Sequence, residues 1–405
     1  MPLVNGDIKV SHTKELLMQN KQQRQTNQLW RERSIVAAHV PLINNFSSND
    51  YLALSHHPKV ISAFQQGLEQ WGAGSGGSPL TTGYQPPHRA LEEELCNWLG
   101  FESALLFNSG YGANQGSLQA ARKLGITPIL DRLCHASLYS GAGDRVQRFR
   151  HNDLPHLQQQ LNKPTKAARL IVSEGLFSMD GDSAPFDDLI QLKQKKERVK
   201  RETLLFIDDA HGLGARGIEG RGSLTPAQSQ QVDLFSATFG KALGCQGAFV
   251  GGSKNWIDYL VQSAGEYIYS TAMPAAQAYA VLAAIKLVRN SEELLQQRLT
   301  SHIQYFRLLS LQFAEKLPQP NEYVFLPSES AIQPLLVGSS ERALYISTAL
   351  QRKGFACVAI RPPTVPNGKA RLRFTVTLHQ THKSMDQMFH VLAELLSKPI
   401  VGASQ

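Results

Sequence analysis

Two short segments carry the side chains with the clearest chemical potential. Asp208 and His211 follow the apolar run LLFI, and Lys241 follows a second apolar run in the segment SATFGKALG. A carboxylate at the end of a buried parallel strand is costly unless it meets a cation. A partly buried lysine has a lowered pKa, so its neutral amine can form a Schiff base with a carbonyl compound. Taken singly, Asp208 could also be a helix N-cap beside a histidine of the core, and Lys241 could be an ordinary solvent-exposed lysine. The two segments together favour the chemical interpretation.

One cofactor, pyridoxal phosphate (PLP), meets both requirements. Its protonated pyridine nitrogen is a partner for Asp208, and the charge makes the ring an electron sink for carbanions. Lys241 supplies the amine for the Schiff base, and His211 can reach the phenolic oxygen of the ring. Gly240 and Gly244 flank this lysine and let the backbone approach a flat ring. The sequence therefore predicts a PLP site at these strand ends.

The phosphate of such a cofactor needs hydrogen-bond donors. The segment NSGYGANQG at 108–116 predicts a strand-to-helix turn whose backbone N–H groups bind phosphate, with Gly110 and Tyr111 as donors. Thr238 can donate to the same phosphate. Ser178, in SEGLFSMDGD past another strand end, can hydrogen-bond to the phenolic oxygen. Ordinary turns remain the alternative interpretation of 108–116 and of Ser178.

The apolar runs before these residues alternate with helical stretches. Five such runs lie between residues 100 and 255, at 104–110, 169–175, 204–211, 233–241 and 247–252. This alternation predicts an α/β fold with a mostly parallel sheet that is covered on both faces. After Pro274, amphipathic helices lead to strand candidates at 332–337, 355–360 and 371–378. We therefore expect an N-terminal helical segment and linker at 1–48, a large domain at 49–287 and a small α/β domain with an antiparallel sheet at 288–405.

Bulk properties exclude several other classes of protein. The chain has 405 residues and a formal net charge of +8, but its densest basic stretch, 193–201, lacks interleaved aromatic residues and reads as a solvated helix face. The four cysteines are far apart, which suggests no disulfide framework and no metal site, and fits a cytoplasmic protein. No segment resembles a signal peptide or a membrane span. The glycine-rich segment 72–77 follows a predicted helix, so it is not a dinucleotide fingerprint.

Several segments, in this order, resemble the α-oxoamine synthase family of fold-type I PLP enzymes, from about Asn45 to His379. They are FSSNDYLALSHHP, GSGGSPLTTGY, HRALEEELCNWLG, SEGLFSMDGDSAPFDDL, FIDDAHGLGARGIEGRG, SATFGKALG, YIYSTAMPAAQA and RPPTVPNGKARLRFTVT. The resemblance implies a fold like that of aspartate aminotransferase. Tyr111 stands where phenylalanine is common in the family, and Cys134 where serine is common.

The resemblance also implies a role for individual residues. Those matched to the cofactor are Lys241 as Schiff-base lysine, Asp208 at the pyridine nitrogen, His135 stacked on the ring, His211 and Ser178 at the phenolic oxygen, and Gly110, Tyr111 and Thr238 at the phosphate. Ser270 and Thr271 match a phosphate contact that the family supplies from the neighbouring subunit, which implies a homodimer. Those matched to substrate are Arg361 at the amino-acid carboxylate, with Thr364, Asn49 and an N-terminal arginine, Arg31 or Arg33. Lys241, His135 and Asp208 are the expected catalytic residues.

The reaction that the resemblance implies is a decarboxylative condensation of an amino acid with an acyl thioester. The segment RPPTVP favours L-alanine and pimeloyl-CoA, or a pimeloyl-acyl carrier protein, over the glycine and serine reactions of the family. A non-catalytic binding module on the same fold is the alternative of another class. It would have no need of Lys241, Asp208, His211, His135 and Arg361 together. We expect no nucleic acid or membrane partner.

Overall fold

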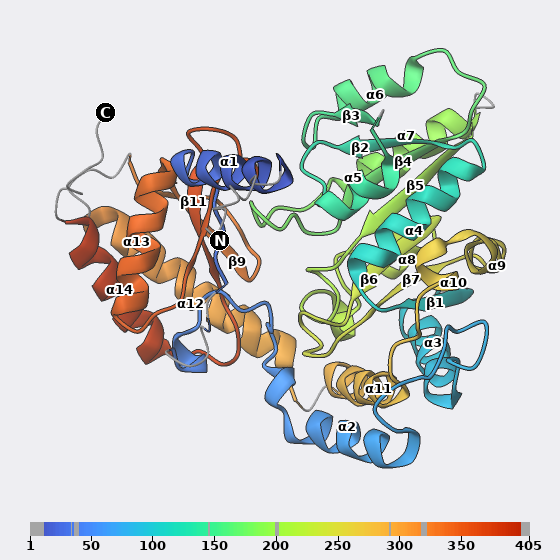
Figure 1. Ribbon diagram of the computed structural model, residues 1–405, viewed down its shortest axis with the longest axis horizontal. Helices are drawn as coiled ribbons and strands as arrows, with labels where there is room; N and C mark the ends of the chain where they lie inside the picture. The colour runs from blue at the N-terminus through green and yellow to red at the C-terminus, as the bar shows by residue number, and fades with distance from the viewer. Residues whose placement is uncertain are drawn as a thin grey trace, which may run out of the picture.

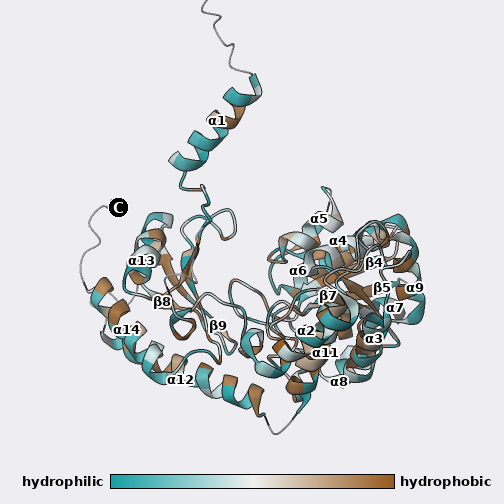
Figure 2. Cartoon of the chain, turned by 60° about the horizontal axis from the view of Figure 1, so that its bottom comes forward, coloured by the Kyte–Doolittle hydropathy of each residue, from teal (hydrophilic) through white to brown (hydrophobic). Residues whose placement is uncertain are grey.

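The computed structural model describes residues 12–33, 35, 40–144, 146–198, 202–290, 293–316 and 322–397. It forms two α/β lobes that lie side by side, each built around its own sheet (Figure 1). The first helix, α1 (His12–Thr26), has no buried residue and projects away from both lobes (Figure 2). In the described part of the chain, no helix is long and apolar enough to cross a membrane.

The larger lobe contains a seven-stranded sheet in the order β1-β7-β6-β5-β4-β2-β3. Its strands are β1 (Ser103–Phe107), β2 (Thr127–Asp131), β3 (Gln147–Phe149), β4 (Arg169–Glu174), β5 (Thr203–Asp208), β6 (Leu234–Thr238) and β7 (Ala248–Gly252). All neighbours pair in parallel except β7, which runs antiparallel to both β6 and β1. The expected mostly parallel sheet is confirmed.

Helices cover both faces of this sheet. Leu204 and Phe206 of β5 pack into one apolar cluster, and Leu205 and Ile207 pack into the other, because successive side chains of a strand point to opposite faces. The first face is covered by α4 (Gly110–Lys123), α5 (Ala136–Ala142), α9 (Lys254–Ser263) and α10 (Gly265–Ile268). The second face is covered by α3 (Pro86–Leu99), α6 (Leu154–Asn162), α7 (Phe186–Arg198) and α11 (Ala275–Arg289), and α2 (Pro58–Trp71) packs on α11. Burial on both faces explains why β4 and β5 are continuous apolar runs.

The smaller lobe contains a four-stranded antiparallel sheet in the order β10-β11-β9-β8. Its elements are β8 (Val324–Phe325), β9 (Ile332–Gly338), β10 (Val358–Ile360), β11 (Ala370–Thr375), α12 (Leu295–Lys316), α13 (Ser340–Arg352) and α14 (His382–Leu396). Short elements in the connections are η2 (Leu42–Asn44), η3 (Leu54–His56), η4 (Ile218–Gly220) and α8 (Pro226–Ser229). The antiparallel sheet agrees with the expectation for the C-terminal part of the chain.

The segment from Asn45 to Tyr51 joins the two lobes. Its backbone bonds to the smaller lobe, since Thr375 N donates to Phe46 O at 2.8 Å and Leu378 N donates to Tyr51 O at 2.9 Å. The chain then continues through η3 into α2 of the larger lobe. A residue in this segment can therefore be anchored in one lobe and reach into the other.

The carboxyl ends of β4, β5 and β6 lie next to one another. The register places Glu174 opposite Asp208, and Asp208 opposite Ser236. In parallel sheets this edge is where ligands bind, and the predicted site residues follow these three strands.

Candidate active site

Asp208, the last residue of β5, is a buried carboxylate. Asn114 of α4 donates from Nδ2 to Asp208 Oδ2 at 2.6 Å, and the Ala210 N–H donates to Oδ1 at 3.0 Å. The Ser236 hydroxyl orients Asn114 by donating to its Oδ1 at 2.6 Å. Among the described residues Asp208 takes part in no ion pair. No described cation lies within ion-pair distance of this carboxylate, which leaves it available to a cationic group of a ligand.

Lys241 lies in the turn after β6. This turn packs tightly on residues 54–55, because Gly244 has a φ of +61° and a side chain there would collide with the Ser55 backbone. Burial lowers the pKa of Lys241 to about 8, although the carboxyl groups of Asp208 and Glu174 act in the opposite direction. Its Nζ makes no hydrogen bond or ion pair with a described residue. A free amine with this pKa is a nucleophile near neutral pH.

His135 begins α5 and lies beside the same carboxyl groups. Its backbone N–H donates to Glu174 Oε1, and its Nδ1 lies 2.8 Å from Ser137 Oγ. Burial lowers the pKa of His135, although the nearby Asp208 raises it. Burial and Asp208 also raise the pKa of Glu174 well above its usual range. These shifts favour the neutral form of both groups.

His211 is buried between the two lobes. Its Nδ1 lies 2.6 Å from the hydroxyl oxygen of Tyr51. Burial, together with the charges of Lys241 and Arg373, lowers the pKa of His211 well below its usual range. Sequence reasoning identified His211 but missed Tyr51, which is 160 residues away in the chain.

The predicted phosphate turn has the expected form. Gly110 begins α4, and the Ser109 hydroxyl caps the helix by accepting from Gly112 N at 3.1 Å. A Cβ atom on Gly110 would lie 3.5 Å from Thr238 Cβ, so the end of β6 adjoins this helix start. The Thr238 hydroxyl donates to Gly247 O at 2.9 Å and accepts from Gly240 N at 3.2 Å. The helix start offers backbone N–H groups to an anion.

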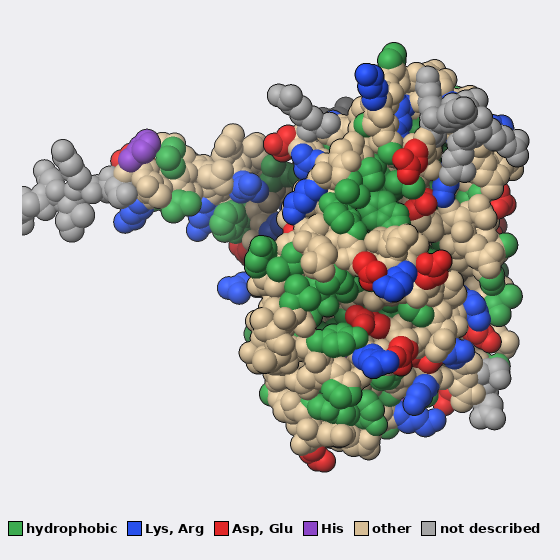
Figure 3. Space-filling view, turned by 90° about the vertical axis from the view of Figure 1, so that its right-hand side faces the viewer, with side chains coloured by type: hydrophobic (Ala, Val, Ile, Leu, Met, Phe, Trp, Pro, Cys, Tyr) green, Lys and Arg blue, Asp and Glu red, His purple; other side chains and the backbone are tan. Residues whose placement is uncertain are grey.

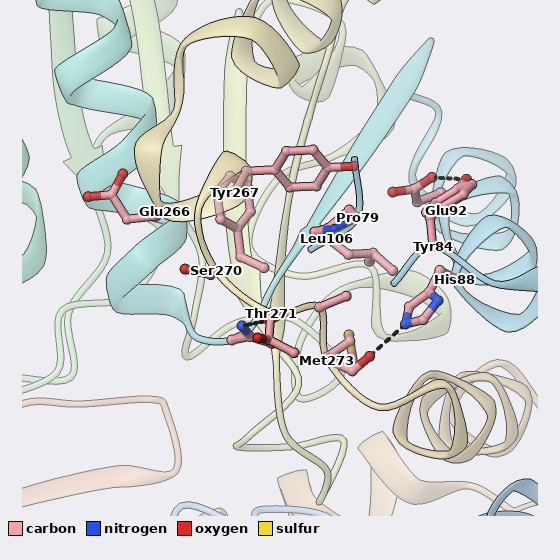
Figure 4. Close-up of a pocket in the computed structure, with 13 residues that line it drawn as sticks. Pro79, Tyr84, His88, Glu92, Leu106, Glu266, Tyr267, Ser270, Thr271 and Met273 are labelled. Atoms are coloured by element: carbon pink, nitrogen blue, oxygen red, sulfur yellow. Dashed lines mark hydrogen bonds between the residues drawn. The ribbon is translucent and has the colours of Figure 1, made fainter. Parts of the chain in front are cut away.

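Ser270 and Thr271 lie near this turn and line a small cavity (Figure 4). Asn108, just before the turn, donates from Nδ2 to Thr271 O at 2.6 Å. On the other side of the cavity, the Tyr84 hydroxyl donates to Glu92 Oε2 at 2.7 Å (Figure 4). Ser270 and Thr271 thus face an accessible surface of their own lobe.

Arg373 of β11 is a second residue near the site that sequence reasoning missed. It is 8% exposed, donates from Nε to Ser178 O at 2.6 Å and from Nη1 and Nη2 to Asn49 Oδ1 at 3.1 and 3.2 Å. Its charge influences the pKa of both Lys241 and His211. The available signal was a pair of arginines, 371 and 373, at alternate positions in an otherwise apolar strand, since such positions share one face of a strand.

Arg361 lies against the N-terminal segment and not beside Arg373. Its guanidinium donates to the carbonyl oxygens of Gln28 and, at 3.5 Å, Trp30. Together with Arg31 and Thr364 it lines a cleft of about 1470 Å³ between the N-terminal segment and β10. Burial, and then the charge of Arg31, lowers the pKa of Arg361. The structure thus brings Arg31, Arg361 and Thr364 together, whereas it places Asn49 with Arg373.

These residues fit PLP. A buried carboxylate without a cation suits a pyridinium nitrogen, a free lysine amine suits the aldehyde, and the start of α4 suits the phosphate. Lys241, Asp208 and the backbone at Gly110 would hold the cofactor, with His135 and His211 beside it. When bound, PLP supplies an electron sink for a carbanion at the amino-acid Cα.

Known proteins resemble this chain along most of its length. The family model "Aminotransferase class I and II" matches residues 42–392. Among solved structures, a serine palmitoyltransferase with PLP as internal aldimine is 25% identical, has a TM-score of 0.83, and the match covers 94% of this chain and 97% of that one. A serine palmitoyltransferase from Sphingomonas wittichii is 25% identical, with a TM-score of 0.79 and coverages of 96% and 98%. An 8-amino-7-oxononanoate synthase from Francisella tularensis is 25% identical, with a TM-score of 0.70 and coverages of 87% and 97%.

The family match spans both lobes, and one of these similar structures has PLP bound on a fold of the same size. The fold and the cofactor that the sequence predicted are therefore confirmed. The chain belongs to the class I and II aminotransferase family, and within it is a PLP-dependent enzyme of the α-oxoamine synthase type.

Proposed function

We propose that this protein is an 8-amino-7-oxononanoate synthase, which condenses L-alanine with pimeloyl-CoA or a pimeloyl-acyl carrier protein and releases CO2, as a step of biotin biosynthesis in the cytoplasm. The observation that carries the reaction type is the convergence of Lys241 and Asp208, at strand ends of the larger sheet, with Arg373 of the smaller lobe. The choice of substrates rests on the segments YIYSTAMP and RPPTVP and on the similarity to the Francisella enzyme.

Each residue has a distinct task in this reaction. Arg373 or Arg361 pairs with the alanine carboxylate, and a guanidinium can do so through two parallel hydrogen bonds. Arg373 lies close enough to Lys241 and His211 to influence the pKa of both, whereas the guanidinium of Arg361 contacts the carbonyl groups of residues 28 and 30 in the N-terminal segment. We therefore assign the carboxylate to Arg373 and keep Arg361 as its competitor.

Lys241 has two roles. It would hold the cofactor covalently in the resting enzyme, and its amine, when free, would act as general base toward the Cα proton. With a pKa of about 8, much of this amine is neutral near pH 8. Asp208 would keep the pyridine nitrogen protonated, and neutral His135 would donate a hydrogen bond to the thioester oxygen as negative charge develops there.

The active form would be a homodimer in which Ser270 and Thr271 bind the cofactor phosphate of the neighbouring subunit. Large hydrophobic side chains, including Leu80, Tyr84 and Tyr269, are exposed in the larger lobe, and Figure 3 shows hydrophobic patches among the charged groups on its outer side. Mixing a Lys241→Ala chain with a Ser270→Ala/Thr271→Ala chain should restore part of the activity that each lacks alone. Unchanged inactivity of the mixture, or a monomer in sedimentation, would refute shared sites.

A substrate matrix tests the proposed function. The purified protein is incubated with alanine, glycine or serine against acetyl-, succinyl-, pimeloyl- and palmitoyl-CoA, CoA release is followed, and the ketone product is identified by mass. The Lys241→Ala variant measures the background. Selective use of alanine with pimeloyl-CoA supports the assignment.

The second candidate is a serine palmitoyltransferase, which the TM-score of 0.83 favours, and a preference for serine with palmitoyl-CoA would establish it. A preference for glycine with acetyl-CoA would indicate a glycine C-acetyltransferase.

A further inference from the structure

Tyr51 connects the smaller lobe to the cofactor side of the larger lobe. Its backbone carbonyl accepts from Leu378 N at 2.9 Å, just beyond β11, while its ring extends toward the larger lobe. The ring is completely buried, and its hydroxyl oxygen lies 2.6 Å from His211 Nδ1. This contact determines which nitrogen of His211 carries the proton, because a neutral imidazole has one donor and one acceptor nitrogen.

Both partners are neutral. Burial raises the pKa of Tyr51 to about 12, although the charge of Arg373 acts in the opposite direction. Burial lowers the pKa of His211, and the charges of Lys241, Arg373 and His135 lower it further. The phenol therefore keeps its proton and the imidazole carries only one.

Two proton arrangements are then possible. In the first, the Tyr51 hydroxyl donates to Nδ1, and Nε2 of His211 carries the hydrogen. In the second, Nδ1 donates to the hydroxyl, which must pass its own proton to another acceptor. The acceptor within reach is Asn49 Oδ1, at 3.4 Å.

The geometry favours the first arrangement. The separation of 2.6 Å between Tyr51 and His211 is typical of a strong hydroxyl donor, whereas 3.4 Å to Asn49 is long for a hydroxyl hydrogen bond. Asn49 Oδ1 also already accepts two N–H groups from Arg373. Arg373 thus occupies the competing acceptor and leaves the Tyr51 proton to His211.

We propose that Tyr51 is a positioning residue that donates to His211 Nδ1, so that the Nε2–H of His211 is available as donor to the phenolic oxygen of PLP. This inference rests on the proposed contact of His211 with that oxygen, and it does not depend on which amino acid or acyl thioester is the substrate. The donor to the phenolic oxygen is then set by a tyrosine whose backbone is hydrogen-bonded to the smaller lobe.

The test uses the PLP-bound enzyme without substrate. In protein labelled with 15N-histidine, two-bond proton–nitrogen correlations report the tautomer of His211, whose signals are identified by their loss in His211→Gln. Wild-type His211 should carry its hydrogen on Nε2, and Tyr51→Phe should populate both tautomers. Hydrogen on Nδ1 in the wild type would overturn the proposal, and this result needs no variant of Tyr51.

The visible absorption of the bound cofactor gives a second readout. A hydrogen bond donated to the phenolic oxygen draws electron density from it and so lowers the pKa of the Schiff-base nitrogen. Tyr51→Phe should weaken that hydrogen bond, and the pH midpoint of the absorption change should therefore rise by roughly 0.5 to 1 unit. Tyr259→Phe is the matched control, because it removes a hydroxyl that donates to Ala120 O at 3.2 Å on the other face of the sheet. An unchanged midpoint and tautomer in Tyr51→Phe would refute the role of Tyr51. Failure of the substrate matrix would leave both readouts intact, which separates this inference from the proposed function.

Discussion

Arg373 Nε donates to the carbonyl oxygen of Ser178 at 2.6 Å, and this bond joins a strand of the smaller lobe to the loop after β4 of the larger lobe. Arg371, two residues earlier on the same face of β11, pairs with Asp180 and donates to Met179 O at 3.3 Å in the same loop. The loop that presents Ser178 is thus held by two arginines of the other lobe. Movement between the lobes would therefore displace Ser178 together with Arg373.

The first prediction separates the two candidate carboxylate ligands. Arg373→Ala should raise the KM for alanine by roughly 30-fold or more, since truncating one partner of a buried charge pair costs about 2 kcal/mol or more. Arg361→Ala should raise it less and leave PLP binding unchanged. Steady-state kinetics with PLP titrations check both. The reverse order of the two KM values would return the carboxylate to Arg361.

The second prediction concerns Lys241. Lys241→Ala should lose the visible absorption of the covalently bound cofactor, and turnover should fall by at least about 10³-fold even with PLP added, because anchor and general base are removed together. Lys254→Ala, which removes an exposed lysine paired with Asp258, is the control and should behave like the wild type. Normal turnover in Lys241→Ala would exclude it as catalytic residue.

The third prediction concerns the charge at the end of β5. Asp208→Asn keeps the shape of the side chain but removes its charge, so the pyridine nitrogen should lose its proton and kcat should fall by about 10²-fold, or about 3 kcal/mol. Kinetics and cofactor absorption measure the effect, and Asp258→Asn on the surface of α9 is the matched control. Equal kcat values for the two variants would contradict the assignment of Asp208.

The fourth prediction uses pH and concerns the loop that carries Ser178. His151 lies between Asp131, 3.0 Å from Nδ1, and Asp182, 2.8 Å from Nε2. Burial by itself lowers the pKa of His151, but the hydrogen bonds with Asp131 and Asp182 outweigh it and raise the pKa to about 9. Because the folded pKa lies above the unfolded value, this stabilisation is complete below about pH 6.5 and is lost as the pH rises to about 9.

Urea unfolding at pH 6 and pH 9.5 tests this prediction. The wild type should lose up to about 3 kcal/mol of unfolding free energy between the two pH values through this group, and His151→Gln should lose less. His390→Gln is the control, because His390 pairs with Glu394 on the exposed side of α14. The same pH dependence in wild type and His151→Gln would show that this imidazolium contributes nothing.

Most of the larger lobe follows from local sequence. The runs before Asp208 and Lys241 are apolar because both faces of β5 and β6 are covered, and this pattern is visible without a structure. Two strands of the sheet were missed. β2 contains Pro128, and β3 is a three-residue edge strand, Gln147–Phe149, with polar residues, so neither forms an apolar run.

The sequence by itself determined the α/β class, the cofactor and the residues at strand ends, because each depends on the order of residues within a few positions of one strand. Only the tertiary structure decided which arginine lies near these strand-end residues. Arg361 and Arg373 stand in one segment, but strand pairing directs Arg373 onto Asn49 and Ser178, while Arg361 meets the N-terminal segment. The partners Asn114 of Asp208 and Tyr51 of His211 are 94 and 160 residues away. Contacts over such separations depend on how the lobes pack, and local spacing in the sequence carries no record of them.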